Sequence, residues 1–410
     1  MNQYKKEVTA VITEKADKSV KTGHPWIYHT EVVSVNGTFE NGDLIQVRNQ
    51  KGKFVGTGFI NEHSKIRIRL ISTNANDRMD ETFFERRLKH AIDYRKTVMG
   101  NDFDCCRLIF GEADFFPGLT VDKFHNLLVT QTLCLGIERL KPLLFSLLYK
   151  IMKEYGEDIC AIYERNDIGI RGLEGMEQNK GFFLLEEQKE PSLPETIEIE
   201  ENKIKYCVDY KNGQKTGFFL DQKYNRSAIA KIAKGKNMLD CFTHTGAFAL
   251  NAAYAGANHV HAVDISQDAV NMAFENAKRN HLENKMSFQC ENVFDLLSEL
   301  AEKKSKEYDF ILLDPPAFTK SNATIKNAVR GYKEINLKAM KILPRGGYLA
   351  TCSCSHFMTD ELFQKMLRDA AKDANVSLRQ IEARQQSPDH PIVWNIPETN
   401  YLKFYIFQIV

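Results

Sequence analysis

Apolar and polar positions change their spacing several times along this chain of 410 residues. Between residues 7 and 72 they alternate with a period of two, in short runs separated by turn pairs such as Asn36-Gly37. Alternation of this kind is typical of half-buried β-strands joined by tight turns. The pattern therefore predicts a small all-β barrel at residues 1–75, with strands at residues 44–48, 54–60 and 65–71.

The spacing becomes helical at residues 80–98, which predicts a linker helix. Strand candidates follow around tight turns, together with a helix at residues 141–155, and they predict a small central α+β domain at residues 76–190. A hairpin near residues 196–209 then leads into a third domain at residues 191–410. We therefore expect an α/β fold class for the third domain, a Rossmann-like one, preceded by a barrel and an α+β domain.

The stretch from Met238 to Ser266 reads as a nucleotide-binding βαβ unit: a short apolar strand, a turn, a helix and a second strand. A dinucleotide site needs three glycines so that the backbone can approach a pyrophosphate, whereas this turn contains only Gly246. Asp264 ends the second strand, where a carboxylate can accept both hydroxyls of a ribose. An adenosine with an amino-acid tail fits these features better than a dinucleotide.

The turn and the acidic strand end resemble motifs I and II of the class I S-adenosylmethionine-dependent methyltransferases. The resemblance implies a Rossmann-like methyltransferase domain and S-adenosylmethionine as the cofactor. It also implies a set of cofactor-binding residues in and around the two motifs: Asp240, Phe242, Thr243, Thr245, Gly246, Asp264 and Ile265.

The segment Lys215 to Arg226 contains Thr-Gly-Phe-Phe-Leu-Asp-Gln and resembles the segment before motif I in a group of bacterial ribosomal RNA methyltransferases. In that group the segment lies over the cofactor, which implies cofactor roles for Phe219, Asp221 and Arg226. A surface ion pair between Asp221 and Arg226 is the alternative. At the expected end of the third strand, Asn292 and Val293 are candidates for the adenine, and an ordinary turn is the alternative there.

An apolar strand leads into Asp314-Pro315-Pro316, which delivers a carboxylate to the edge of the sheet where open α/β folds bind ligands. The two prolines keep the following backbone extended, and we expect their carbonyl groups and Asp314 to bind a base. Phe318 is a candidate to stack on an extruded base. These residues predict a substrate pocket, and Asp314 is also a candidate for the cofactor site and for catalysis.

The sequence Thr351-Cys352-Ser353-Cys354-Ser355 resembles motif VI of the RNA cytosine-5 methyltransferases. That resemblance implies a thiolate that attacks carbon 6 of cytosine, with Cys352 as the aligned nucleophile, and Cys354 stays open as the alternative. Ala317 stands where many such enzymes have a second cysteine, so the base that assists product release is unassigned. Related ribosomal RNA methyltransferases modify guanine nitrogen 7, and for that reaction both cysteines are structural.

The segments at residues 23–28 and 40–43 resemble the PUA domain, an RNA-binding pseudo-barrel. Residues 1–100 carry 17 Lys and Arg against 12 Asp and Glu, which is a weak basic excess. Alternation along the strand at residues 65–71 places Lys65, Arg67 and Arg69 on one face, as candidates for RNA phosphates. A barrel that contacts only protein is the alternative.

Composition places the chain among globular proteins, with 43% hydrophobic and 27% charged residues. Its longest apolar runs are too short to span a membrane, and its first residues lack the apolar core of a signal peptide, so we expect a cytoplasmic protein. The nine cysteines are scattered and lack the spacing of zinc ligands. We therefore expect reduced thiols and no metal.

Together the resemblances imply an S-adenosylmethionine-dependent enzyme that methylates a base of large-subunit ribosomal RNA or its precursor, with carbon 5 of a cytosine as the first choice. The alternatives are a guanine nitrogen-7 methyltransferase, an RNA-binding assembly factor with a vestigial cofactor site, and a small-molecule methyltransferase. The sequence leaves open the target nucleotide, and whether the chain is a monomer or a homodimer.

Overall fold

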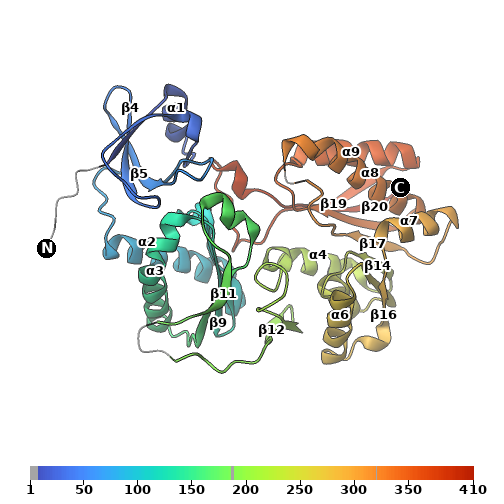
Figure 1. The fold of residues 1–410 in the computed structure, drawn as a ribbon. Coiled ribbons are helices and arrows are strands. Elements are labelled where there is room, and N and C mark those ends of the chain that lie inside the picture. The colour runs from blue at the N-terminus through green and yellow to red at the C-terminus, as the bar shows by residue number, and fades with distance from the viewer. Residues whose placement is uncertain (1–7, 186–188, 320) are drawn as a thin grey trace. The chain divides into compact units, whose positions relative to one another are not determined.

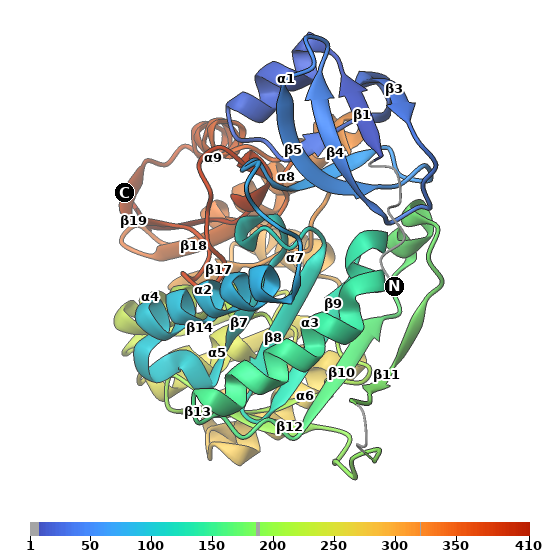
Figure 2. The same ribbon diagram turned by 90° about the vertical axis from the view of Figure 1, so that its left-hand side faces the viewer.

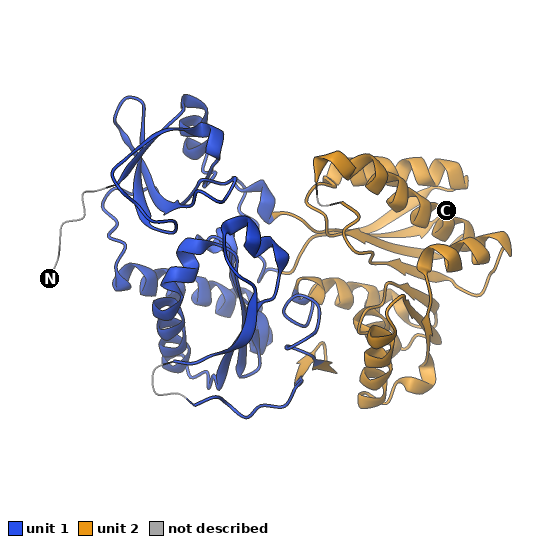
Figure 3. Cartoon of the chain, viewed as in Figure 1, with its two compact units in different colours: residues 1–197, 208–220, 388–399 blue, residues 198–207, 221–387, 400–410 orange. Residues whose placement is uncertain are grey.

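The computed structural model of the protein describes residues 8–185, 189–319 and 321–410. The chain forms two compact units, which Figure 3 shows in different colours. Unit 1 contains residues 1–197, 208–220 and 388–399, and unit 2 contains residues 198–207, 221–387 and 400–410. Two short segments from the C-terminal half of the sequence thus belong to unit 1. The domain boundaries near residues 75 and 190 stay a prediction.

The first part of unit 1 is the predicted barrel, a six-stranded sheet with the order β2-β6-β5-β4-β1-β3. Its apolar core alternates with polar positions along the strands, as in β4, where every second side chain is buried. The strand predicted at residues 65–71 is shorter than expected and begins later in the sequence, at Ile68, as β6. The elements are β1 (Thr9–Ile12), α1 (Glu14–Lys21), β2 (Trp26–Ile27), β3 (Val32–Asn36), β4 (Leu44–Asn49), β5 (Phe54–Ile60) and β6 (Ile68–Ser72).

The second part of unit 1 is a five-stranded sheet with the order β11-β10-β9-β8-β7. The linker helix is confirmed as α2, and α2 and α3 pack side by side on one face of this sheet (Figure 2). Both helices place their apolar side chains toward the strands, as helical spacing predicts. The elements are α2 (Glu81–Met99), β7 (Cys105–Phe110), β8 (Leu119–Phe124), β9 (Leu127–Thr132), α3 (Leu135–Glu154), β10 (Ala161–Asn166) and β11 (Asn179–Phe183).

Unit 2 is built on a seven-stranded sheet with the order β16-β15-β14-β17-β18-β20-β19. The first five of these strands are parallel, and β20 runs antiparallel to both of its neighbours. The chain crosses from β14 to β15 and β16 on one side and then to β17 and β18 on the other side. The strands are β14 (Asn237–Cys241), β15 (His259–Asp264), β16 (Met286–Cys290), β17 (Phe310–Leu313), β18 (Tyr348–Ser353), β19 (Leu378–Arg384) and β20 (Lys403–Ile409).

Helices cover both faces of this sheet, α4 to α6 on one side and α7 to α9 on the other (Figure 1). All four residues of β17 are buried, as expected for a central parallel strand that is covered on both faces. The helices are α4 (Lys223–Ala233), α5 (Ala247–Tyr254), α6 (Gln267–Arg279), α7 (Val293–Glu302), α8 (Ile325–Ile342) and α9 (Asp360–Ala374). The predicted α/β fold class is confirmed in this arrangement.

The hairpin predicted near residues 196–209 is present as β12 (Ile197–Glu201) and β13 (Ile204–Val208). Its turn residues Asn202 and Lys203 both have left-handed φ angles, of 55° and 66°. None of the helices in the described part of the chain is both long enough and apolar enough to cross a bilayer.

Candidate functional site

The strand order of unit 2 has a topological switch point between β14 and β17, where the crossovers leave in opposite directions. Open α/β sheets bind ligands outside the carboxyl ends of the strands at such a point. The register brings these ends level, because Cys241 pairs with both Val263 and Leu313, and Leu313 pairs with Thr351. The residues that follow these positions therefore meet at one edge of the sheet.

The turn after β14 has an unusual backbone. Phe242, His244 and Gly246 all have left-handed φ angles, of 63°, 51° and 81°. A side chain at Gly246 is excluded, because a Cβ atom there would lie 2.9 Å from the Cβ of Ala273. Left-handed conformations of non-glycine residues cost free energy and concentrate at ligand-binding sites. The sequence predicted the role of Gly246 but not the two strained residues before it.

Asp264 stands at the carboxyl end of β15, next to this turn. Its Oδ2 accepts a hydrogen bond from the backbone N–H of His244 at 2.9 Å, and its Oδ1 accepts one from that of Ser266 at 2.9 Å. A carboxylate has about four acceptor positions, so two remain for further donors. The adjacent Ile265 is 72% exposed. A fixed carboxylate beside an exposed apolar side chain fits the ribose and the base of an adenosine.

Asp240 is fully buried behind the turn. Its Oδ2 accepts hydrogen bonds from the hydroxyl of Thr243 at 2.6 Å and from the N–H of Ala249 at 3.0 Å, whereas its Oδ1 has no hydrogen-bond partner among the described residues. Burial, reinforced by the nearby carboxylate of Asp314, raises the pKa of Asp240 to about 7. A buried carboxylate oxygen without a partner fits a cationic group of a ligand.

The raised pKa of Asp240 predicts a pH-dependent stability. The folded state holds the proton more tightly than the unfolded state, whose ordinary pKa is 3.8, so stability falls as pH rises from about 4 to about 7. We expect a loss on the order of 3 kcal/mol over this window without ligand, and a flatter profile in Asp240→Asn. Urea unfolding at a series of pH values measures it, with the exposed Asp295→Asn variant as the control. Parallel profiles for wild type and Asp240→Asn would contradict the assignment.

Asp314 and Cys352 meet at the ends of β17 and β18. The Cys352 thiol donates a hydrogen bond to Oδ1 of Asp314, with 2.7 Å between sulfur and oxygen, and Nε2 of Gln222 lies 3.3 Å from the same oxygen. Cys352 is completely buried, and this burial, together with the charge of Asp314, raises the pKa of the thiol well above its ordinary value. The thiol is therefore protonated at rest, with a carboxylate in position to accept its proton.

Cys354 lies just beyond the end of β18, which stops at Ser353. It is half-buried. Lys403 pairs with Ser353 in the β18–β20 ladder, and its ammonium donates hydrogen bonds to the carbonyl groups of Ser355 at 2.6 Å and Tyr401 at 2.7 Å. Burial lowers the pKa of Lys403 to about 8. The sequence analysis missed Lys403, Tyr401 and Gln222.

Aromatic rings connect the turn after β14 with the loop after β17. The ring centroids of Phe242 and Phe294 are 6.5 Å apart. Those of Phe294 and Phe318 are 5.8 Å apart, and those of Phe318 and Tyr332 are 4.6 Å apart. Phe318 is half-buried in this row, so its stacking on a base stays a prediction. Of the two prolines before it, Pro315 is buried and Pro316 is exposed.

Several predicted residues have other positions than expected. Arg226 donates two hydrogen bonds to Glu201, at 2.6 Å and 2.9 Å, and both side chains are buried. The structure thus gives Arg226 an anchoring role between α4 and β12, in place of the predicted cofactor contact. Asp221 accepts a hydrogen bond from the hydroxyl of Tyr401 at 2.5 Å, and its contact with the cofactor stays a prediction.

The other residues predicted to contact the adenine and the cofactor lie in different surroundings. Asn292 caps α7, since its Oδ1 accepts the N–H of Phe294 at 3.0 Å, and only its exposed NH₂ group faces solvent as a donor. Val293 is buried in the core of unit 2. The carbonyl of Thr245 accepts a hydrogen bond from Asn276 at 3.1 Å, which holds the turn. In unit 1, the ammonium of Lys215 lies over the ring of Phe219, 4.8 Å from the ring centroid.

The ion pairs of unit 1 contradict part of the prediction that Lys65, Arg67 and Arg69 form a basic face on the barrel. Lys65 is exposed, but Arg67 is buried and pairs with Glu62 at 2.6 Å. Arg69 pairs with Glu112 at 3.1 Å and Glu174 at 2.9 Å, and these carboxylates belong to the central sheet domain. Because their charges are satisfied within the fold, the two arginines link parts of unit 1, and of the three only Lys65 is placed for an RNA phosphate.

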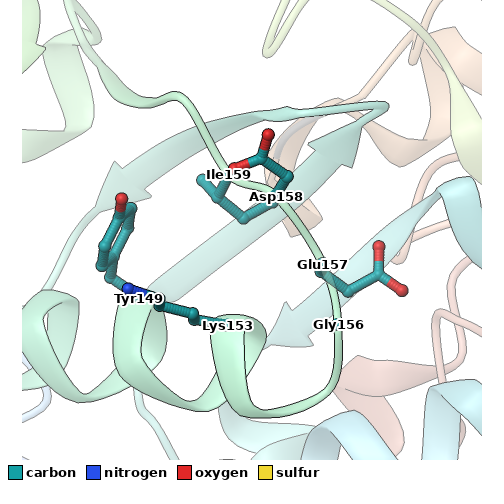
Figure 4. A pocket seen from close by; sticks show the side chains of 6 residues that line it. All are labelled: Tyr149, Lys153, Gly156, Glu157, Asp158 and Ile159. Carbon is teal, nitrogen blue, oxygen red and sulfur yellow. The ribbon is translucent and has the colours of Figure 1, made fainter.

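A pocket of about 270 Å³ lies elsewhere, at the end of α3 (Figure 4). It belongs to unit 1, and charges of both signs surround it. Its lining residues are Tyr149, Lys153, Gly156, Glu157, Asp158 and Ile159. None of the motif residues contributes to it, so the candidate site is the strand edge of unit 2. Within the described residues, no cluster of His, Cys, Asp or Glu is suited to hold a metal ion.

Comparison with known proteins gives matches along most of the chain. Residues 10–73 match the PUA-like domain, and residues 187–407 match the S-adenosylmethionine-dependent methyltransferase family. The chain is 40% identical over 395 residues to the ribosomal RNA large subunit methyltransferase I of Pseudoalteromonas translucida, covering 96% of this chain and 97% of that protein. It is 37% identical over 405 residues to the protein of that name from Escherichia coli O157:H7, covering 98% and 100%.

Solved structures show the same fold over the whole length. A methyltransferase of Streptococcus mutans superimposes with a TM-score of 0.81 at 22% identity, covering 98% of this chain and 99% of that chain. A second methyltransferase structure, solved in complex with SAH, superimposes with a TM-score of 0.82 at 21% identity, with the same coverage.

Proposed function

The chain belongs to the S-adenosylmethionine-dependent methyltransferase family, and from this membership we propose that it methylates a base of large-subunit ribosomal RNA, at carbon 5 of a cytosine. Its full-length relatives are large-subunit ribosomal RNA methyltransferases, and its PUA-like domain is of a kind that binds RNA. The observation that carries the choice of carbon 5 is the hydrogen bond of 2.7 Å from the Cys352 thiol to Asp314.

The residues at the strand edge of unit 2 fit S-adenosylmethionine. Asp264 would hold the ribose hydroxyls, Ile265 would contact the adenine, and the buried carboxylate of Asp240 would face the cationic end of the cofactor. When bound, the cofactor supplies an electrophilic methyl group.

The Cys352–Asp314 pair matches what carbon 5 requires. This carbon is a poor nucleophile until a thiolate has added to carbon 6 of the ring. We assign the attacking sulfur to Cys352, which transfers its proton to Oδ1 of Asp314 as the sulfur–carbon 6 bond forms. The electron pair of the carbon 5–carbon 6 double bond is then available at carbon 5 to accept the methyl group. The carbon 5 proton is then lost to solvent, the sulfur–carbon 6 bond breaks with its electron pair on sulfur, and Asp314 returns the proton to the thiol as the product is released.

The burial of Cys352 favours one second candidate function. A completely buried thiol with a raised pKa is also what a structural cysteine looks like. Methylation of guanine nitrogen 7 needs no covalent adduct with the enzyme, so in that case both Cys352 and Cys354 would serve the fold alone.

The substrate class is tested with labelled S-adenosylmethionine and ribosomal RNA that lacks the modification. We expect the purified protein to label large-subunit RNA and to leave small-subunit RNA unlabelled. Labelling of both RNAs to the same extent, or of neither, would contradict the proposed substrate.

The cofactor assignment predicts the effect of Asp264→Ala. This substitution removes the carboxylate that would accept hydrogen bonds from the ribose hydroxyls, each worth on the order of 1–3 kcal/mol, so we expect S-adenosylmethionine to bind tenfold more weakly or worse. Isothermal titration calorimetry measures the affinity. The Asp309→Asn variant is the control, because Asp309 lies just before β17, at the opposite edge of the sheet. An unchanged affinity of Asp264→Ala would refute the ribose contact.

A further inference from the structure

Trp394 is the most exposed large apolar side chain in the described part of the protein, with 96% of its surface open to solvent. Its indole makes no hydrogen bond or ring contact among these residues. Tryptophan is normally buried for most of its surface, and exposed ones are enriched where a protein binds a partner. The fold gives no internal reason for this placement.

The loop that carries Trp394 is fixed rather than loose. The hydroxyl of Thr399 accepts the N–H of Val393 at 2.9 Å and donates to the carbonyl of Ile396 at 2.7 Å, and Ile396 is completely buried. At the beginning of the segment, buried Asp389 accepts the N–H of Arg107 at 2.8 Å. The indole is therefore presented in one position by a loop that is anchored on both sides.

The loop lies against the PUA-like barrel within unit 1. Glu398 contacts Nε2 of His24 at 3.2 Å, and the side chain of Asn395 fills the space where Gly23 would carry a Cβ. Gly23 follows the last turn of α1, where Lys21 exposes 66% of its side chain and pairs with Asp17 at 2.6 Å. The loop that presents Trp394 is thus held beside the end of α1, within the same unit.

The surroundings of Trp394 indicate the kind of partner. Protein-binding sites place their aromatic residues in the centre of a contiguous apolar patch. Here the neighbours in the loop include exposed Asn395, and Glu398, Ile392 and Val393 are half-buried. A single aromatic face with polar neighbours suits an unpaired nucleobase, because every base has a face for stacking.

We propose that Trp394 is a stacking platform for an unpaired nucleobase of the RNA substrate. The inference rests on the proposed RNA substrate and adds a binding residue outside the methyl-transfer site. It makes Trp394 an RNA-positioning residue, whose loss raises KM for RNA and leaves kcat and S-adenosylmethionine affinity unchanged.

The chain has two tryptophans, so fluorescence reports on each one separately. In Trp26→Phe the only indole is Trp394, and we expect a short single-stranded oligoadenylate to quench its emission. In Trp394→Phe the only indole is Trp26, which is part-buried and hydrogen-bonded to Glu112, and we expect no quenching. Equal quenching of both variants, or of neither, would overturn the proposal.

Affinity for large-subunit RNA, measured by filter binding, gives the second test. We expect Trp394→Ala to weaken binding about five- to 100-fold and Trp394→Phe to retain most of it, because phenylalanine keeps an aromatic face. Leu173→Ala is the matched control, since Leu173 is also apolar and 66% exposed in unit 1. Unchanged binding by Trp394→Ala, or a loss as large in Leu173→Ala, would overturn the proposal.

The outcomes separate this inference from the proposed function. If the wild type methylates large-subunit RNA and Trp394→Ala binds that RNA equally well, only the role of Trp394 fails. If the wild type neither binds nor labels the RNA, the substrate class fails and the role of Trp394 with it. A change from dimer to monomer in Trp394→Ala, seen by light scattering, would assign the indole to a second copy of the chain and overturn the proposal.

Discussion

Cys352→Ala is expected to lose methyl transfer to RNA by about 1,000-fold or more, while its affinity for S-adenosylmethionine stays unchanged. The reason is that carbon 5 of cytosine accepts the methyl group only after sulfur has added to carbon 6. Single-turnover transfer of labelled methyl groups measures the rate. RNA that contains 5-fluorocytidine at the target position provides a second readout, because it retains the covalent adduct, and the variant should form none.

Cys354→Ala is the matched control for this prediction. The two cysteines are two residues apart, and it is the Cys352 thiol that donates to the carboxylate of Asp314 at 2.7 Å. We expect Cys354→Ala to keep its rate within a few-fold. A reversed result would make Cys354 the nucleophile. A double variant that keeps most of its rate would return both cysteines to a structural role and favour guanine nitrogen 7.

Asp314→Asn is expected to reduce kcat by about 100- to 10,000-fold. An amide in place of the carboxylate cannot take the thiol proton, although it has nearly the same shape. The rate of the variant should also rise with pH over a wider range than that of the wild type, because Cys352 must then ionise without a base and burial raises its pKa well above the ordinary value. Methyl transfer measured at a series of pH values tests both expectations.

Asp309→Asn serves as the control here as well, since Asp309 precedes the same strand and accepts a hydrogen bond from the N–H of Asn237 at 3.0 Å. Its kcat and pH profile should match those of the wild type. If Asp314→Asn kept both the wild-type rate and the wild-type pH profile, Asp314 would not be the proton acceptor.

The sequence predicted the parts of the fold and site that depend on local patterns. The apolar run of β17 and the acidic end of β15 mark buried parallel strands, and parallel strands bring their carboxyl ends to one edge. This is why the sequence alone was enough to place Asp264 and Asp314 at the site. Gly246 could be assigned to the turn for the same local reason.

Long-range pairing explains what the sequence did not predict. Lys403 reaches the end of β18 only because β20 inserts antiparallel beside it, and no local spacing announces that neighbour. Arg226 donates to Glu201, 25 residues earlier in the chain, and no local spacing indicates that contact. Alternation along the strand predicted an exposed Arg69. In the structure it pairs with carboxylates of the next domain, which a local pattern cannot indicate.

The most direct test of the central claim is the identity of the methylated nucleoside. The purified protein is incubated with S-adenosylmethionine and unmodified large-subunit RNA, and the RNA is digested to nucleosides for mass spectrometry. We expect 5-methylcytidine. Recovery of 7-methylguanosine would contradict it: the fold and the cofactor site would stand, and Cys352 and Asp314 would lose their proposed roles in a covalent mechanism.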